Sequence, residues 1–116
     1  MNAQELKTLI QSYTYHFTTE IQLQDGIEHV FKAHNVPYIR EKIIGLNRID
    51  FVSLSIAIEI KIKGNLQNVI RQLHRYAQLP DFTEVILITS SNRHIIPPTL
   101  NNKTITVINI GLHRSL

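Results

Sequence analysis

The feature of the sequence that most constrains the fold is the run Ile56–Lys63, in which isoleucine occupies every second position. Successive side chains of a β-strand point to opposite faces of its sheet, so this alternation predicts a strand with one face made of isoleucine. The other face carries Ala57, Glu59, Lys61 and Lys63. Charges inside so apolar a strand are costly to bury unless they are paired or bind an ion. Glu59 and Lys61 are therefore the first candidates for a functional role.

The patterns around this strand predict an α/β domain. Helical spacing of apolar side chains predicts a helix over Leu66–Leu79. The uninterrupted apolar run Glu84–Thr89 predicts a strand that is buried on both faces, as in parallel pairing. Between Ser90 and Asn102 we expect a loop or a short helical turn. The other expected elements are two helices followed by two strands, and a final strand: Ala3–Tyr15, Glu20–His34, Tyr38–Ile44, Arg48–Ser53 and Thr104–Ile110. The order α-α-β-β-β-α-β-β predicts a mixed β-sheet flanked by helices.

Length and composition set the class of protein. A chain of 116 residues suits a single domain, with a core over residues 20–110 and a helical extension over residues 1–17. The absence of cysteine excludes disulfides, cysteine-based zinc sites and thiol catalysis. No apolar run approaches the roughly 18–20 residues of a membrane span, and no signal-peptide pattern is present, so we expect a cytoplasmic protein. The net charge of +3 is compatible with a nucleic-acid partner but does not require one.

Two acidic residues and a lysine are expected to converge on neighbouring strands. If the chain reverses symmetrically about Leu54-Ser55, Asp50 lies directly opposite Glu59, with Cβ atoms about 4.5–5.5 Å apart. Lys61 then points to the same side as Glu59. Like charges placed opposite each other destabilise a sheet, whereas Mg²⁺ accepts carboxylate oxygens and keeps room for water and phosphate. A neighbouring lysine can orient or deprotonate an attacking water, so the pattern predicts metal-assisted hydrolysis of a phosphodiester.

A simpler interpretation fits the same residues. Glu59 and Lys61 can form a solvated salt bridge, worth about 0–1 kcal/mol, in an unrelated small α/β domain. Asp50 can be an ordinary polar residue near a turn. A metal titration separates the two interpretations, because only the hydrolytic site needs an ion between Asp50 and Glu59.

The pattern Arg-Ile-Asp-Phe, a short turn and Ile-Ala-Ile-Glu-Ile-Lys-Ile-Lys-Gly resembles the core of the PD-(D/E)xK nuclease superfamily. The resemblance covers residues 20–110 and is nearest to small stand-alone members, such as archaeal Holliday-junction resolvases and VRR-NUC domains. It implies a restriction-endonuclease-like fold. It also implies that Asp50 and Glu59 bind Mg²⁺ or Mn²⁺, that the carbonyl of Ile60 assists, and that Lys61 serves the water. The sequence departs from the family pattern at Ile49, which replaces the proline of the family's name.

The resemblance also implies a glutamate from the helix that precedes the strands. Glu20 continues the apolar stripe of that helix at its N-terminal end, so Glu20 is expected to complete the catalytic set with Asp50, Glu59 and Lys61. Glu20 is also the kind of residue that a helix dipole favours in a first turn. Glu28 is expected to face outward, and Glu41 is expected to be an exposed charge on the first strand.

Residues on the helix after Lys61 are expected to support the site. Gln72 and Tyr76 are similar to the Gln-x-x-x-Tyr element of RecB-like members, where this element supports the site and contacts substrate. The helical spacing of Tyr76 also suits a core residue. Lys63 and Arg75 belong to a set of basic residues that can form a phosphate-tracking surface or an ordinary solvated one: Arg40, Lys42, Arg48, Lys61, Lys63, Arg71 and Arg75.

The sequence therefore predicts a Mg²⁺-dependent endonuclease that acts on DNA. The alternative is a catalytically inactive protein with the nuclease fold that binds nucleic acid or a protein partner. The apolar stripe of the predicted helix Ala3–Tyr15 needs cover, and on this ground the sequence predicts a homodimer.

Overall fold

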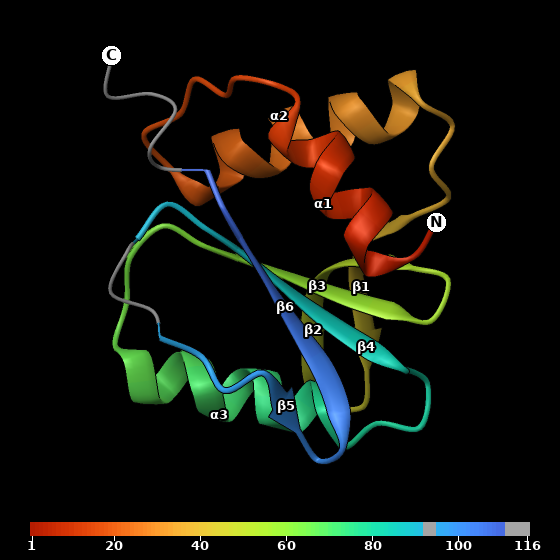
Figure 1. Ribbon diagram of the computed structural model, residues 1–116, viewed down its shortest axis with the longest axis vertical. Coiled ribbons are helices and arrows are strands. Elements are labelled where there is room, and N and C mark those ends of the chain that lie inside the picture. Colours follow the sequence, from red (N-terminus) through yellow and green to blue (C-terminus); the bar gives the residue numbers. More distant parts are fainter. Residues whose placement is uncertain (92–94, 111–116) are drawn as a thin grey trace.

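The computed structural model describes residues 1–91 and 95–110. Helices cover both faces of a central sheet (Figure 1), with α1 (Ala3–Gln11) and α2 (Glu20–Ala33) on one face and α3 (Leu66–Ala77) on the other. The α/β architecture expected from the sequence is thus confirmed. None of the helices in the described part of the chain is long and apolar enough to cross a membrane.

The sheet is mixed and open. In the described residues it has six strands in the order β1-β2-β3-β4-β6-β5. In chain order the strands are Ile39–Ile44 (β1), Asn47–Ser53 (β2), Ile56–Lys61 (β3), Glu84–Thr89 (β4), Thr99–Leu100 (β5) and Lys103–Asn109 (β6). β1, β2 and β3 form an antiparallel meander, and β4 pairs in parallel with both β3 and β6. The parallel, doubly buried strand predicted over Glu84–Thr89 is therefore confirmed.

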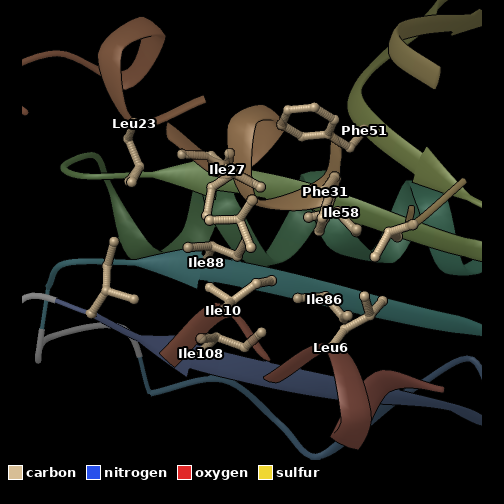
Figure 2. Close-up of a cluster of buried hydrophobic side chains, with 14 of the residues drawn as sticks. Leu6, Ile10, Leu23, Ile27, Phe31, Phe51, Ile58, Ile86, Ile88 and Ile108 are labelled. Carbon is tan, nitrogen blue, oxygen red and sulfur yellow. The ribbon is translucent and has the colours of Figure 1, made fainter. Parts of the chain in front are cut away.

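Isoleucines of the central strands form the core beneath α1 and α2. Figure 2 shows Ile58, Ile86, Ile88 and Ile108 facing the side chains that α1 and α2 turn inward. The apolar stripe of α1 is buried here, since Leu6 and Ile10 are fully covered. The chain's own sheet thus provides the cover that this stripe needs, and the stripe no longer argues for a homodimer.

The first helix is shorter than predicted: it ends at Gln11, whereas the prediction extended it to Tyr15. The Ser12 hydroxyl donates a hydrogen bond to the carbonyl of Leu9, a local bond that competes with continuation of a helix. Tyr15 instead turns inward and donates a hydrogen bond from its hydroxyl to the carbonyl of Ile10.

The segment predicted as a loop contains a short hairpin, so this part of the prediction is wrong. Thr99–Leu100 pairs antiparallel with the start of β6. Asn101 and Asn102 connect the two strands with φ angles of 51° and 62°, the left-handed region that asparagine tolerates in tight hairpin turns. The Asn-Asn pair was the signal for this hairpin. The prediction for this segment also covers residues 92–94, which lie outside the described residues.

Candidate functional site

The candidate site forms where β2 and β3 separate. The observed register is the predicted one, with Phe51 opposite Ile58 and Ser53 opposite Ile56. The paired residues end one position before Asp50 and Glu59, so these two residues are not a ladder pair. At this point the Asp50 carboxylate accepts a hydrogen bond of 2.8 Å from the main-chain N–H of Ile60. Asp50 thus holds the two strands together at the site.

Glu59 lies at the buried centre of the site, with only 2% of its surface exposed. One carboxylate oxygen, Oε1, accepts a hydrogen bond of 3.0 Å from the Tyr76 hydroxyl, and Oε2 lies 3.4 Å from Nζ of Lys61. Tyr76 is buried in α3 and also lies 3.0 Å from the carbonyl oxygen of Arg48. Gln72 donates from Nε2 to the Tyr76 hydroxyl at 3.0 Å. Of the two α3 residues expected to support the site, Tyr76 therefore contacts Glu59 directly, and Gln72 is connected to Glu59 through Tyr76.

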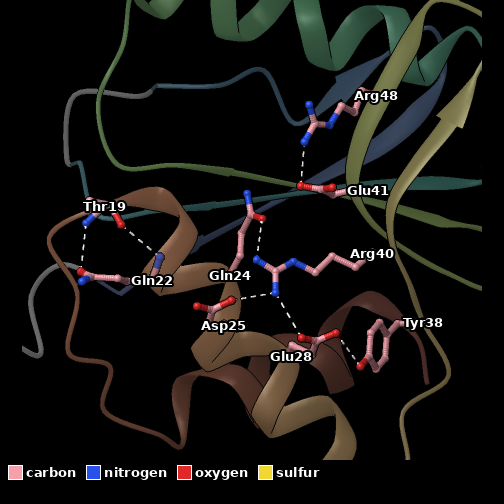
Figure 3. A network of polar contacts seen from close by, with 9 residues as sticks. All are labelled: Thr19, Gln22, Gln24, Asp25, Glu28, Tyr38, Arg40, Glu41 and Arg48. Carbon is pink, nitrogen blue, oxygen red and sulfur yellow. Dashed lines mark hydrogen bonds and ion pairs between the residues drawn. The ribbon is translucent and has the colours of Figure 1, made fainter.

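Glu20 reaches the same site from α2. Its carboxylate accepts a hydrogen bond of 3.1 Å from the main-chain N–H of Ile62. Ile62 lies just beyond β3, whose paired part ends at Lys61, two residues earlier than predicted. The capping box between Thr19 and Gln22 (Figure 3) fixes the first turn of α2. Glu20 belongs to this turn.

The other two glutamates considered from the sequence lie elsewhere. Glu28 accepts hydrogen bonds from the Tyr38 hydroxyl at 2.8 Å and from Arg40 at 3.1 Å. Glu41 forms an ion pair of 2.7 Å with Arg48 (Figure 3). The structure thus brings Glu20 together with Asp50, Glu59 and Lys61.

Arg40 holds α2 against the edge of the sheet. Its guanidinium donates to Asp25 at 2.8 Å and to Gln24 at 3.1 Å, besides Glu28 (Figure 3). Gln24 is buried one helical turn after Glu20, so these bonds help to fix the rotation of the helix that presents Glu20. From the sequence, Arg40 belonged to a set of basic residues that could form a phosphate-tracking surface or an ordinary solvated one. In the structure its guanidinium pairs with Asp25 and Glu28 of α2. Such a role depends on how α2 packs on β1, which no local pattern indicates.

The remaining basic candidates lie near the site or face solvent. Lys63 is exposed just beyond the end of β3, two residues after Lys61. Arg75 is exposed in the last turn of α3, on the residue before Tyr76, and within the described residues it forms no ion pair. Arg48 is paired with Glu41, which reduces its availability for phosphate.

The two carboxyl groups at the centre of the site, those of Asp50 and Glu59, both have raised pKa values. Burial, and after it the neighbouring negative charge of Asp50, raise the pKa of Glu59 to about 8, although Lys61 and the Tyr76 hydroxyl act in the opposite direction. Burial also raises the pKa of Asp50, against the hydrogen bond from Ile60 and the charge of Lys61, and Glu20 adds to the rise. Negative charge at the site thus exceeds what Lys61 neutralises.

This excess predicts that the metal-free protein loses stability as the pH rises. Between the ordinary pKa of 4.5 and about 8, Glu59 is ionised in the unfolded chain and protonated in the folded protein. Folding then takes up a proton, so the free energy of unfolding falls with rising pH. Glu59→Gln keeps an acceptor for Tyr76 and removes the ionisation, and should therefore flatten this slope in thermal melts with chelator. The exposed carboxylate variant Glu41→Gln is the matched control, and an equal effect of the two substitutions would contradict the assignment.

The oxygen donors of the site fit a divalent cation of the Mg²⁺ type. Asp50 and Glu59 offer carboxylates, and the main chain of Ile60 offers a carbonyl. No group of three or more His, Cys, Asp or Glu side chains that could hold a metal ion occurs in the part of the chain that the structure describes. Water or substrate oxygens would have to complete the coordination, which is the usual arrangement for Mg²⁺. A divalent cation would also offset the neighbouring negative charge that, besides burial, raises both pKa values.

Comparisons of this chain with protein-family models, with curated proteins and with solved structures find no match. The functional interpretation therefore depends on the sequence and on the geometry of the site.

Proposed function

We propose that this chain is a divalent-metal-dependent endonuclease that hydrolyses phosphodiester bonds of DNA and has a PD-(D/E)xK-type core. The observation that carries the proposal is Glu59, a carboxylate buried between Asp50 and Lys61 on an otherwise apolar strand. A buried acid beside a second acid destabilises the folded protein, so such a pair is expected mainly where a function requires it. Metal-assisted chemistry on a phosphate is such a purpose.

The arrangement of the elements supports the same proposal. A helix, a three-stranded antiparallel meander, a helix and a parallel strand follow one another from α2 to β4, which suits a restriction-endonuclease-like core. All four proposed catalytic residues meet at the end of β3 (Glu20, Asp50, Glu59 and Lys61).

Each of these residues has a distinct task in the proposed reaction. Asp50 and Glu59 would hold Mg²⁺ or Mn²⁺ with the carbonyl of Ile60. When bound, the ion supplies Lewis acidity to the phosphoryl oxygen and to a water molecule. Lys61 orients the attacking water or stabilises the charge that develops on the phosphate, because its ammonium lies beside Glu59. Glu20 fixes the main chain just after Lys61 through its bond to Ile62.

A cleavage assay tests the proposal. Purified protein, given Mg²⁺ or Mn²⁺, should nick or cut at least one member of a panel of duplex, branched and single-stranded DNAs, and chelator should abolish the activity. Survival of the whole panel with Mn²⁺ would contradict the nuclease. If the intact DNAs are nevertheless bound, the catalytically inactive nucleic-acid-binding alternative replaces it.

A further inference from the structure

Two hollows lie on either side of Lys63 at the end of β3. The first, of about 330 Å³, is lined by Phe17, Thr18, Ile62, Lys63 and Ser90. The second, of about 230 Å³, lies against α3, and its lining includes Lys61, Lys63, Asn68 and Gln72. Lys63 is shared by both hollows, and it forms no ion pair with any described residue.

The first hollow is connected to the proposed catalytic site through the main chain of Ile62. Ile62 donates its main-chain N–H to Glu20, and its carbonyl oxygen accepts from the Ser90 hydroxyl at 3.4 Å. Phe17 and Ile62, which are partly buried and pack against the core beneath α1 and α2, give this hollow two apolar side chains, whereas Thr18 and Ser90 give it hydroxyls. An aromatic ring beside an aliphatic wall and a few polar groups suits a nucleobase and its sugar.

The second hollow differs in character, because its lining is cationic and polar. Lys61 belongs to both this hollow and the proposed catalytic site, and Gln72 connects the hollow to Glu59 through Tyr76. Asn68 contributes an amide, which accepts a hydrogen bond from Arg71 at 2.9 Å. A phosphate bound at Lys63 would therefore contact ammonium and amide groups of the second hollow. Because Lys63 also lines the first hollow, the nucleoside attached to that phosphate could lie there.

We infer that these hollows bind one unpaired nucleotide next to the phosphodiester bond that is cut, with its base and sugar against Phe17 and its phosphate at Lys63. The inference rests on the proposed function and deepens it. A base within a duplex is stacked and paired, and so cannot enter a hollow of the protein without leaving the helix, whereas an unpaired base can. The substrate class is therefore DNA with an unpaired nucleotide at the cleavage point, such as a flap, a frayed end or a single strand.

Binding measured in chelator tests this inference separately from catalysis. The probes are a blunt duplex and the same duplex with a single-stranded flap that carries 2-aminopurine as its first unpaired base. The wild-type protein should bind the flap about tenfold more tightly, in line with one base stacked on an aromatic side chain, and should quench the 2-aminopurine fluorescence. Equal affinity for the two DNAs, or no quenching, would overturn the inference without use of any variant.

Variants locate the subsite. Phe17→Ala should remove the preference for the flap and leave duplex affinity unchanged, whereas Tyr13→Ala, which removes an exposed aromatic ring on the same connecting segment, should leave the preference intact. Lys63→Gln should weaken binding of both DNAs. Retention of the preference in a folded Phe17→Ala protein would overturn the assignment.

Cleavage with Mn²⁺ distinguishes failure of this inference from failure of the proposed function. Equal cleavage of duplex and flap would overturn the unpaired-nucleotide inference and leave the nuclease intact. Flap preference and quenching without any cleavage would contradict the nuclease and support the subsite. No binding of either DNA would contradict both.

Discussion

Replacement of Lys61 by alanine should lower the rate of DNA cleavage by about 10²-fold or more, the effect of losing a positioned electrostatic or acid-base group. The same substitution should leave the affinity for Mn²⁺ unchanged or slightly increased. Nζ of Lys61 lies 3.4 Å from Glu59, so its removal takes a positive charge away from the carboxylates that would hold the ion. Calorimetry for Mn²⁺ and a cleavage assay on the same preparation measure both effects.

Lys32→Ala is the matched control for this experiment. Lys32 is an exposed lysine in the last turn of α2, about 18 Å along the helix from Glu20, and should have no effect on either measurement. Cleavage by Lys61→Ala at the wild-type rate would show that the lysine has no catalytic role.

Asp50→Asn should abolish cleavage through a different cause, the loss of the metal. The amide oxygen of asparagine can still accept the hydrogen bond from Ile60, so the junction of β2 and β3 should be retained. The negative charge is lost, and with it one of the two proposed carboxylate ligands. We expect the affinity for Mn²⁺ to fall sharply and cleavage to fall with it, while DNA binding largely survives because a charge that repels phosphate is removed.

The matched control is Asp25→Asn, the same change on the outer side of α2. Asp25 is exposed and pairs with Arg40, which is also bonded to Gln24 and Glu28, so its loss should leave Mn²⁺ affinity unchanged. Unchanged Mn²⁺ affinity in Asp50→Asn would refute its assignment as a ligand.

Local patterns in the sequence predicted the frame of the site well. The alternation along Ile56–Lys63 and the short connection at Leu54-Ser55 were enough to predict the register of β2 and β3. The apolar stripe of α2 favoured Glu20 over Glu28, and in the structure Glu20 accepts a hydrogen bond from Ile62, just beyond β3. These features depend on residues that are close in sequence or on strict periodicity, and both can be recognised in a single sequence.

Contacts between distant segments could not be predicted in the same way. The bond that Ile62, just beyond β3, donates to Glu20 joins residues that lie far apart in the chain. The assignment of Arg40 to α2 depends on three side chains of that helix. The cover of α1 by the chain's own sheet depends on the position of β6, the last strand. Each is a consequence of tertiary packing and has no local signature.

The central claim is that Asp50 and Glu59 form a divalent-metal site, and diffraction from crystals grown or soaked with Mn²⁺ tests it most directly. Anomalous scattering identifies the ion independently of any activity, and crystals of Asp50→Asn prepared in the same way provide the control. We expect an anomalous peak within coordination distance of the carboxylates of Asp50 and Glu59 in the wild-type protein, and none in the variant. Absence of the peak from wild-type crystals, with both carboxylates still bonded only to the protein, would show that Asp50 and Glu59 do not bind the metal.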